Sequence, residues 1–124
     1  MNIALIGLGS MGYNLAKNMV SKNYQVNAFE KNMLIVENIK NDNIQNLYLL
    51  NSIQDLVDKT PSPRIIMLSL PADKIDKCIN DLIDHINSTD IIVDLGNSLY
   101  LKSMEREKLL SRFNISFLGI GVSG

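Results

Sequence analysis

Three glycines near the start of the chain, Gly7, Gly9 and Gly12, restrict its fold more than any other feature. A short apolar run at residues 2–6 leads into them and indicates a buried strand. Apolar residues at helical spacing follow at residues 11–22, which predicts a helix directly after the glycines. A strand that enters a helix through a tight glycine turn is the opening unit of a doubly wound α/β fold.

The rest of the chain continues this alternation of strand and helix. Apolar runs predict strands at residues 2–6, 25–29, 47–50, 65–70, 91–94 and 115–118. Periodicity and capping residues predict helices at residues 11–22, 33–40, 53–58, 75–86 and 99–112. We therefore expect one Rossmann-type domain over residues 1–124, with a doubly wound, mainly parallel six-stranded sheet and helices on both faces.

Individual residues indicate where these helices begin and which of their faces are buried. Ser52 and Ser98 stand where N-caps are expected. Met11, Leu15 and Met19 recur at helical spacing, which predicts a buried stripe that includes Met11.

The spacing Gly7-Leu8-Gly9-Ser10-Met11-Gly12 between a strand and a helix is typical of a loop that holds the phosphates of a dinucleotide. Gly7 allows the tight turn, Gly9 lets the backbone approach a pyrophosphate, and Gly12 lets the helix pack close to the strand. The N-terminus of the helix offers unpaired N–H groups and partial positive charge to the phosphates. The alternative is an ordinary strand–helix turn without a ligand.

Glu30 ends the second predicted strand, close to the roughly 20 residues after the last glycine at which a ribose-binding acid is expected. A carboxylate there accepts hydrogen bonds from ribose hydroxyls and repels a 2′-phosphate, so it favours NAD as the cofactor. Lys31 points the other way, since a lysine beside the ribose can pair with that phosphate, and NADP is therefore the alternative cofactor. Glu30 as a solvated charge at a strand end is the simpler alternative.

Several stretches together resemble the N-terminal domain of 6-phosphogluconate dehydrogenase (decarboxylating), within the β-hydroxyacid dehydrogenase superfamily. They are the glycine loop, Pro63-Arg64-Ile65-Ile66, Asp90-Ile91-Ile92-Val93-Asp94, Gly96-Asn97-Ser98 and Gly121-Val122-Ser123-Gly124. The resemblance covers essentially the whole chain. One departure is Leu95, which stands where the family usually has glycine and adds bulk beside the expected nicotinamide pocket.

The resemblance implies roles for individual residues. Asn97 matches the asparagine that the family places near the nicotinamide and the sugar acid. Without the resemblance, a helix-capping turn is the favoured interpretation of Asn97 and Ser98. Ser123 and Gly124 match positions that bind the substrate. Leu70-Pro71-Ala72 matches the loop after the fourth strand that touches the cofactor, in a form common in the NAD-using branch.

The resemblance also implies an activity for the full-length protein. It would oxidise 6-phosphogluconate, a small sugar-acid phosphate, with NAD or NADP and release carbon dioxide to give ribulose 5-phosphate, and it would form a homo-oligomer. The family's catalytic lysine and glutamate, and its helical domain, lie beyond the position of Gly124, so we assign no catalytic residue and expect this chain alone to be inactive. Another β-hydroxyacid substrate, such as that of a 3-hydroxyisobutyrate-type enzyme, and a non-catalytic nucleotide-binding module are the alternatives.

Composition excludes several other classes. The formal net charge of −1 argues against a nucleic-acid partner, and no apolar run approaches the ~20 residues of a membrane span. Cys78 is the single cysteine, which favours a cytoplasmic protein. Neither Cys78 nor His85 has a partner at metal-ligand spacing, so no metal site is predicted. The charged stretch at residues 102–108 is expected to be a solvated helix face.

Overall fold

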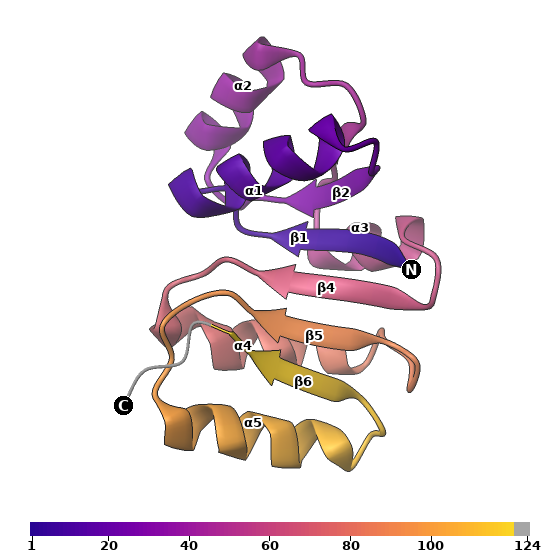
Figure 1. Ribbon diagram of the computed structural model, residues 1–124, viewed down its shortest axis with the longest axis vertical. Helices are drawn as coiled ribbons and strands as arrows, with labels where there is room; N and C mark the ends of the chain where they lie inside the picture. Colours follow the sequence, from indigo (N-terminus) through magenta and orange to yellow (C-terminus); the bar gives the residue numbers. More distant parts are fainter. Residues whose placement is uncertain (121–124) are drawn as a thin grey trace.

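Strands and helices alternate along residues 1–120, the part of the chain that the computed structural model describes (Figure 1). The strands are β1 (Asn2–Ile6), β2 (Val26–Phe29), β3 (Leu47–Leu49), β4 (Arg64–Leu68), β5 (Ile91–Asp94) and β6 (Ser116–Gly119). The helices are α1 (Ser10–Ser21), α2 (Met33–Asp42), α3 (Ile53–Lys59), α4 (Ala72–Ile83) and α5 (Tyr100–Ser111). Every predicted element is present, in the predicted order.

All six strands run parallel in the order β3-β2-β1-β4-β5-β6, which confirms the predicted doubly wound sheet. The chain reverses its direction of travel across the sheet between β1 and β4. Ile6, the last residue of β1, pairs with Phe29 on one side and Leu68 on the other. Ligands of open α/β sheets bind at such a reversal, beyond the carboxyl ends of the strands.

Two apolar layers cover the two faces of the sheet. On one face α1 and α2 pack against it through residues such as Ala16 and Ile39, which belong to the same core cluster as Leu5 of β1. On the other face α3, α4 and α5 contribute residues such as Ile79 and Leu110. In Figure 1 α1 lies in front of β2, and α4 lies behind β5 on the opposite face of the sheet. Because both faces are covered, successive strand residues are apolar on both sides, as expected for buried parallel strands.

Two details of the predicted helices are wrong. Met11 has 52% of its surface exposed, and the buried face of α1 is formed by Gly12 and Ala16 instead. The glycine brings the helix so close to β1 that the contact falls one residue later than the methionine spacing indicated. The second error concerns α4, which begins at Ala72 and ends at Ile83 rather than spanning 75–86, with Pro71 directly before its first turn.

Of the two predicted N-caps, the structure confirms one and shows the other to be wrong. The hydroxyl of Ser52 accepts a hydrogen bond from the amide of Asp55 at 3.0 Å, which confirms it as the N-cap of α3. Ser98 does not cap α5, whose N-cap is Leu99 without a side-chain bond. The Ser98 hydroxyl donates to the carboxylate of Asp94 and accepts from Nη1 of Arg106 instead, so it is held by charged side chains rather than by the first N–H groups of α5.

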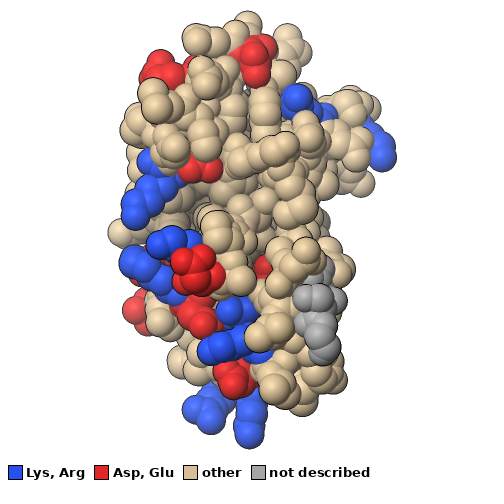
Figure 2. All heavy atoms as spheres, turned by 90° about the vertical axis from the view of Figure 1, so that its left-hand side faces the viewer, with Lys and Arg blue, Asp and Glu red and all other residues tan. Residues whose placement is uncertain are grey.

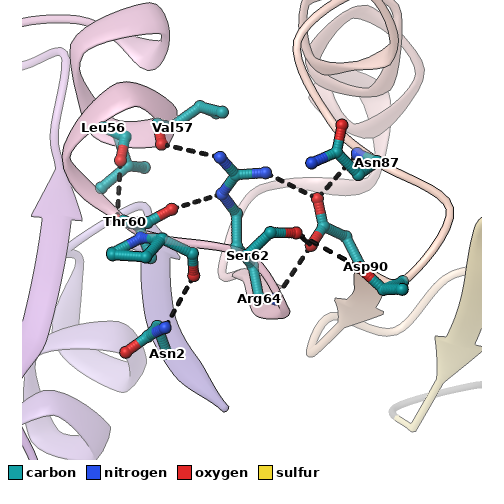
Figure 3. A network of polar contacts seen from close by, with 10 residues as sticks. Asn2, Leu56, Val57, Thr60, Ser62, Arg64, Asn87 and Asp90 are labelled. Carbon is teal, nitrogen blue, oxygen red and sulfur yellow. Dashed lines mark hydrogen bonds and ion pairs between the residues drawn. The ribbon is translucent and has the colours of Figure 1, made fainter.

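A buried ion pair joins β4 to the start of β5 at the amino ends of the strands (Figure 3). The Arg64 guanidinium lies 2.8 Å from the Asp90 carboxylate and also donates to the backbone oxygens of Thr60 and Val57. The Asp90 side chain is fully buried, and Ser62 donates to it as well. This network holds the edge of the sheet opposite the carboxyl ends. Within the described residues, no helix is both long and apolar enough to cross a membrane.

Candidate functional site

The glycine loop lies at the carboxyl end of β1, where the chain turns into α1. Gly7 has φ +98°, and a Cβ built there would lie 2.1 Å from the backbone oxygen of Ser69. A Cβ on Gly12 would lie 2.2 Å from the backbone oxygen of Gly7. Both positions therefore exclude every other residue type, which confirms the tight turn and the close helix–strand approach that the sequence predicts.

Gly9 differs from the other two glycines because a Cβ there would meet no protein atom within 4 Å. It is the N-cap of α1, and it is exposed together with Ser10 and Met11. The space over Gly9 is therefore open at the helix end where unpaired N–H groups favour an anion. A phosphate group can approach the backbone at Gly9 without displacing protein.

Leu8 is buried, unlike its neighbours Gly9 and Ser10 in the loop. Its side chain is buried at 2% exposure in the core beneath α1 and α2. Its amide donates to Oε1 of Glu30 at 2.7 Å, so within this structure that N–H is already paired. The exposed members of the loop are Gly9, Ser10 and Met11.

Glu30 follows the last residue of β2 and faces the glycine loop. Its second oxygen, Oε2, accepts a hydrogen bond from the amide of Asn32 at 2.8 Å. The two backbone amides therefore fix the carboxylate at the mouth of the loop, with lone pairs left for further donors. Lys31 beside it is exposed.

A cavity of about 190 Å³ opens between Glu30 and the start of α4. Its floor and walls are largely apolar, with Phe29, Ile53 and Cys78 among them. Its charged lining residues are Glu30, Lys31, Lys74, Lys77 and Asp81. An apolar slot with a few polar groups at its mouth suits a flat heterocycle such as adenine attached to a ribose.

Figure 2 looks onto the carboxyl ends of the strands, the edge that faces left in Figure 1. This face is hollowed near its centre, and basic side chains with acidic ones among them gather along one side of it. A larger cavity, of about 560 Å³, opens beside β3 and is lined by residues such as Asn27, Tyr48 and Lys59. That cavity includes none of the predicted site residues. Gly7, Glu30, Lys31 and Leu70 line the smaller cavity at the strand ends, and Leu8, Gly9 and Ser10 line a separate one on the side of α1 and α2.

The loop after β4 forms the other wall of this hollow. Leu70 is half-buried and lines the cavity, whereas Pro71 and Ala72 are exposed at the start of α4. The loops after β4 and β5 lie close together, because a Cβ built on Gly96 would lie 3.2 Å from the backbone oxygen of Leu70. Asn97 is exposed on the second of these loops. Ser123 and Gly124 lie outside the described residues.

A family model described as the NAD binding domain of 6-phosphogluconate dehydrogenase matches residues 2–124. The chain belongs to this family. It is 36% identical over 124 residues to the decarboxylating 6-phosphogluconate dehydrogenase of Buchnera aphidicola subsp. Acyrthosiphon pisum. It is 39% identical over 127 residues to the enzyme of the same name from Staphylococcus aureus strain N315. Each alignment covers 98% of this chain and 26% of the relative, so the chain spans about a quarter of their length.

Solved structures agree with this assignment. The 6-phosphogluconate dehydrogenase of Plasmodium falciparum superposes with a TM-score of 0.85 at 26% identity, over 94% of this chain and 26% of that one. The 3-hydroxyisobutyrate dehydrogenase of Mycobacterium tuberculosis superposes with a TM-score of 0.80 at 20% identity, over 98% of this chain and 40% of that one. The second likeness shows a shared fold alone.

In this NAD-binding domain, sequence analysis assigned one charged residue to the wrong environment. Arg106 of α5 is only 4% exposed, although the stretch 102–108 was expected to be a solvated face. Its Nε donates to Asp76 of α4 at 2.8 Å and its Nη1 donates to Ser98 at 2.9 Å. The hydrogen bond from Arg106 holds the pKa of the Asp76 carboxyl below its usual range, with the opposing contribution of burial outweighed. The spacing of Ser103, Arg106 and Leu110 on one helix face could have indicated burial.

Proposed function

We propose that this domain binds NAD along the carboxyl ends of its strands, between the glycine loop and the loop that carries Asn97. The observation that carries the proposal is Glu30. Its carboxylate is held by the amides of Leu8 and Asn32 at the point where the adenosine ribose of a dinucleotide would enter the apolar cavity. The open space over Gly9 supports a pyrophosphate at the start of α1.

The same arrangement supports NAD over NADP. A 2′-phosphate on the ribose would approach a carboxylate that two backbone amides keep in place, and the repulsion costs affinity. Lys31 and Lys74, which line the same cavity, reduce this cost without removing it. We therefore expect NADP to bind, and NAD to bind more tightly.

In the protein to which this domain belongs, we propose the oxidative decarboxylation of 6-phosphogluconate. The nicotinamide, when bound, supplies the acceptor for a hydride from the substrate. The residues of this chain bind and orient: Asn97 offers an amide donor and acceptor at the strand ends, and Ser123 with Gly124 would contact the sugar acid. The support for this substrate is the family to which the chain belongs.

The test is an assay of the full-length protein with 6-phosphogluconate and either dinucleotide, following reduced nicotinamide by absorbance and released carbon dioxide. We expect turnover, with a higher kcat/KM for NAD. Turnover only with other β-hydroxy acids from a panel would contradict the substrate. Tight NAD binding without turnover on any acid would instead indicate a non-catalytic nucleotide-binding module.

We also propose that the protein is cytoplasmic and that the full-length form is a homo-oligomer. The single thiol, Cys78, is buried and supports a reducing compartment. The oligomeric state follows from the family resemblance, and light scattering of the full-length protein would measure it.

A further inference from the structure

The loop that carries Asn97 is held at both ends by one carboxylate. Asp94, the last residue of β5, is fully buried, and its Oδ1 accepts from the amide of Gly96 at 2.9 Å. Its Oδ2 accepts from the hydroxyl of Ser98 at 2.5 Å. Asn97 stands exposed between these two anchored neighbours, so the position of its amide depends on where Asp94 and Ser98 are held.

Arg106 contacts both Asp94 and Ser98. Its Nη1 lies 2.9 Å from the hydroxyl of Ser98 and 3.5 Å from Oδ2 of Asp94. Its Nε is occupied by Asp76, 2.8 Å away on α4. One buried guanidinium therefore joins α5 and α4 to the loop after β5. A lysine cannot reproduce this arrangement, because its ammonium is a single point charge without a planar fork.

The guanidinium also neutralises a charge that would otherwise be isolated. A fully buried carboxylate such as Asp94 is costly unless it is paired and hydrogen-bonded. Two hydrogen bonds from its own loop satisfy part of the Asp94 carboxylate, and Arg106 supplies the opposite charge. Loss of Arg106 would thus loosen the loop, since Asp94 would then draw other donors or water toward itself.

We propose that Arg106 is a positioning residue that sets the place of Asn97 for the nicotinamide end of the cofactor. This inference rests on the proposed function, in which Asn97 faces that end. If the role of Arg106 is purely structural, its replacement lowers stability and weakens the binding of every ligand of the domain alike. If Arg106 positions Asn97, its replacement weakens the binding of a ligand that carries nicotinamide and leaves the binding of one that lacks it unchanged.

The experiment compares NAD with ADP-ribose, which retains both riboses and the pyrophosphate but lacks the nicotinamide. Calorimetric titrations of the chain are made for wild type, Arg106→Lys and the control Lys102→Gln. Lys102 is on the same helix, and its ammonium lies 4.0 Å from the carboxylate of Asp76. Unlike Arg106, Lys102 is exposed. Urea unfolding of each variant reports whether it is folded.

We expect Arg106→Lys to lower the affinity for NAD about tenfold, equivalent to about 1.4 kcal/mol, and the affinity for ADP-ribose by less than about twofold. The control should change neither affinity by more than about twofold. Equal weakening of both ligands, or no weakening of NAD, overturns the proposal for Arg106. A wild-type chain that binds neither ligand contradicts the proposed function itself, and the two failures are thus distinguishable.

Should Arg106→Lys fail to fold, Ser98→Ala takes its place. That variant removes the hydroxyl between Arg106 and the loop but keeps the charges of Arg106 and Asp94, which lie 3.5 Å apart. The same selective loss of NAD affinity is expected, and an unchanged ratio of NAD to ADP-ribose affinity overturns the proposal.

Discussion

The backbone amide of Leu8 donates a hydrogen bond to the carboxylate of Glu30, with 2.7 Å between nitrogen and oxygen. The two residues lie just beyond the carboxyl ends of the neighbouring strands β1 and β2. The bond ties the glycine loop to the acid that follows β2, so the phosphate-facing and ribose-facing parts of the proposed site are held as one unit. The Asn32 amide holds the other carboxylate oxygen and prevents rotation.

Replacing Glu30 by Gln should weaken NAD binding and reduce the preference for NAD over NADP. Hydrogen bonds to a charged group contribute about 1.5–3 kcal/mol, so we expect NAD affinity to fall roughly tenfold or more. NADP should lose less, because the repulsion of its 2′-phosphate disappears. Calorimetric titration measures both affinities, with Glu37→Gln as the control at an exposed position of α2. A larger loss for NADP than for NAD would contradict this prediction.

Two glycine variants should separate folding from binding. Gly7→Ala places a Cβ 2.1 Å from a backbone oxygen at φ +98°, and we expect the free energy of unfolding to fall by about 3 kcal/mol or more. Gly9→Ala meets no protein atom, so its stability should change by less than about 0.5 kcal/mol. Its methyl group would occupy the space of the phosphates, and NAD affinity should drop. Urea unfolding and calorimetry measure the two effects.

The glycine prediction has clear contrary outcomes. A Gly7→Ala chain as stable as wild type would show that the turn at Ser69 relaxes easily. A stable Gly9→Ala chain that binds NAD as tightly as wild type would show that the pyrophosphate lies elsewhere.

The buried pair of Arg64 and Asp90 should make the fold sensitive to acid (Figure 3). Burial alone would raise the pKa of Asp90, but hydrogen bonds from Asn87, Ser62 and Arg64 together outweigh it and lower this pKa below its ordinary 3.8. A carboxyl with a lowered pKa in the folded state contributes stability above its ordinary pKa and loses it as the pH falls toward the folded-state value. Stability should therefore decline below about pH 4.

Asp90→Asn tests this contribution directly. It leaves Arg64 buried without its counter-charge, and we expect a loss of about 3 kcal/mol at neutral pH. The difference in stability from wild type should shrink as the pH falls below about 4, because the Asp90 carboxyl of the unfolded wild-type chain protonates there while the folded one stays ionised to lower pH. Urea unfolding at a series of pH values measures it. A difference that is the same at pH 7 and at pH 3 would contradict the account.

Cys78 should react slowly with thiol reagents in the folded chain. Its side chain is 5% exposed, and burial, with the nearby charge of Asp81, raises its pKa to about 12 despite the opposing charge of Lys77. Thiolate is the reactive form, so little is present at pH 8. Labelling with a disulfide reagent should be fast in urea and slow without it, and bound NAD should slow it further because Cys78 lines the cavity. Equal rates in the folded and unfolded chain would disprove this.

The alternation of strands and helices was predictable because each element carries a strong local pattern. The unusual backbone at Gly7 and the close contact at Gly12 were predictable for a related reason, since the spacing of the glycines between a strand and a helix is itself a local pattern. The roles of Asn97, Ser123 and Gly124 remain predictions that rest on resemblance.

Arg106 could not be placed from sequence because its partners are distant in the chain. Asp76 and Asp94 come from different elements, and the charged neighbours of Arg106 on α5 gave the whole stretch a solvated appearance. The prediction of Ser98 as a cap was wrong for the same reason, since its hydroxyl accepts from the distant Arg106 rather than from the N–H groups of α5. Met11 was misplaced because the approach of α1 to β1 is set by Gly12 rather than by the larger side chains.

The most direct test of the central claim is a nuclear magnetic resonance titration of the ¹⁵N-labelled chain with NAD. We predict that the largest shifts of backbone and side-chain amide signals fall at Gly9 and Ser10, at Glu30 and Lys31, at Leu70 and at Asn97. Shifts centred on the cavity beside β3, around Tyr48 and Lys59, or no shifts at millimolar NAD, would contradict a dinucleotide site at the carboxyl ends of the strands.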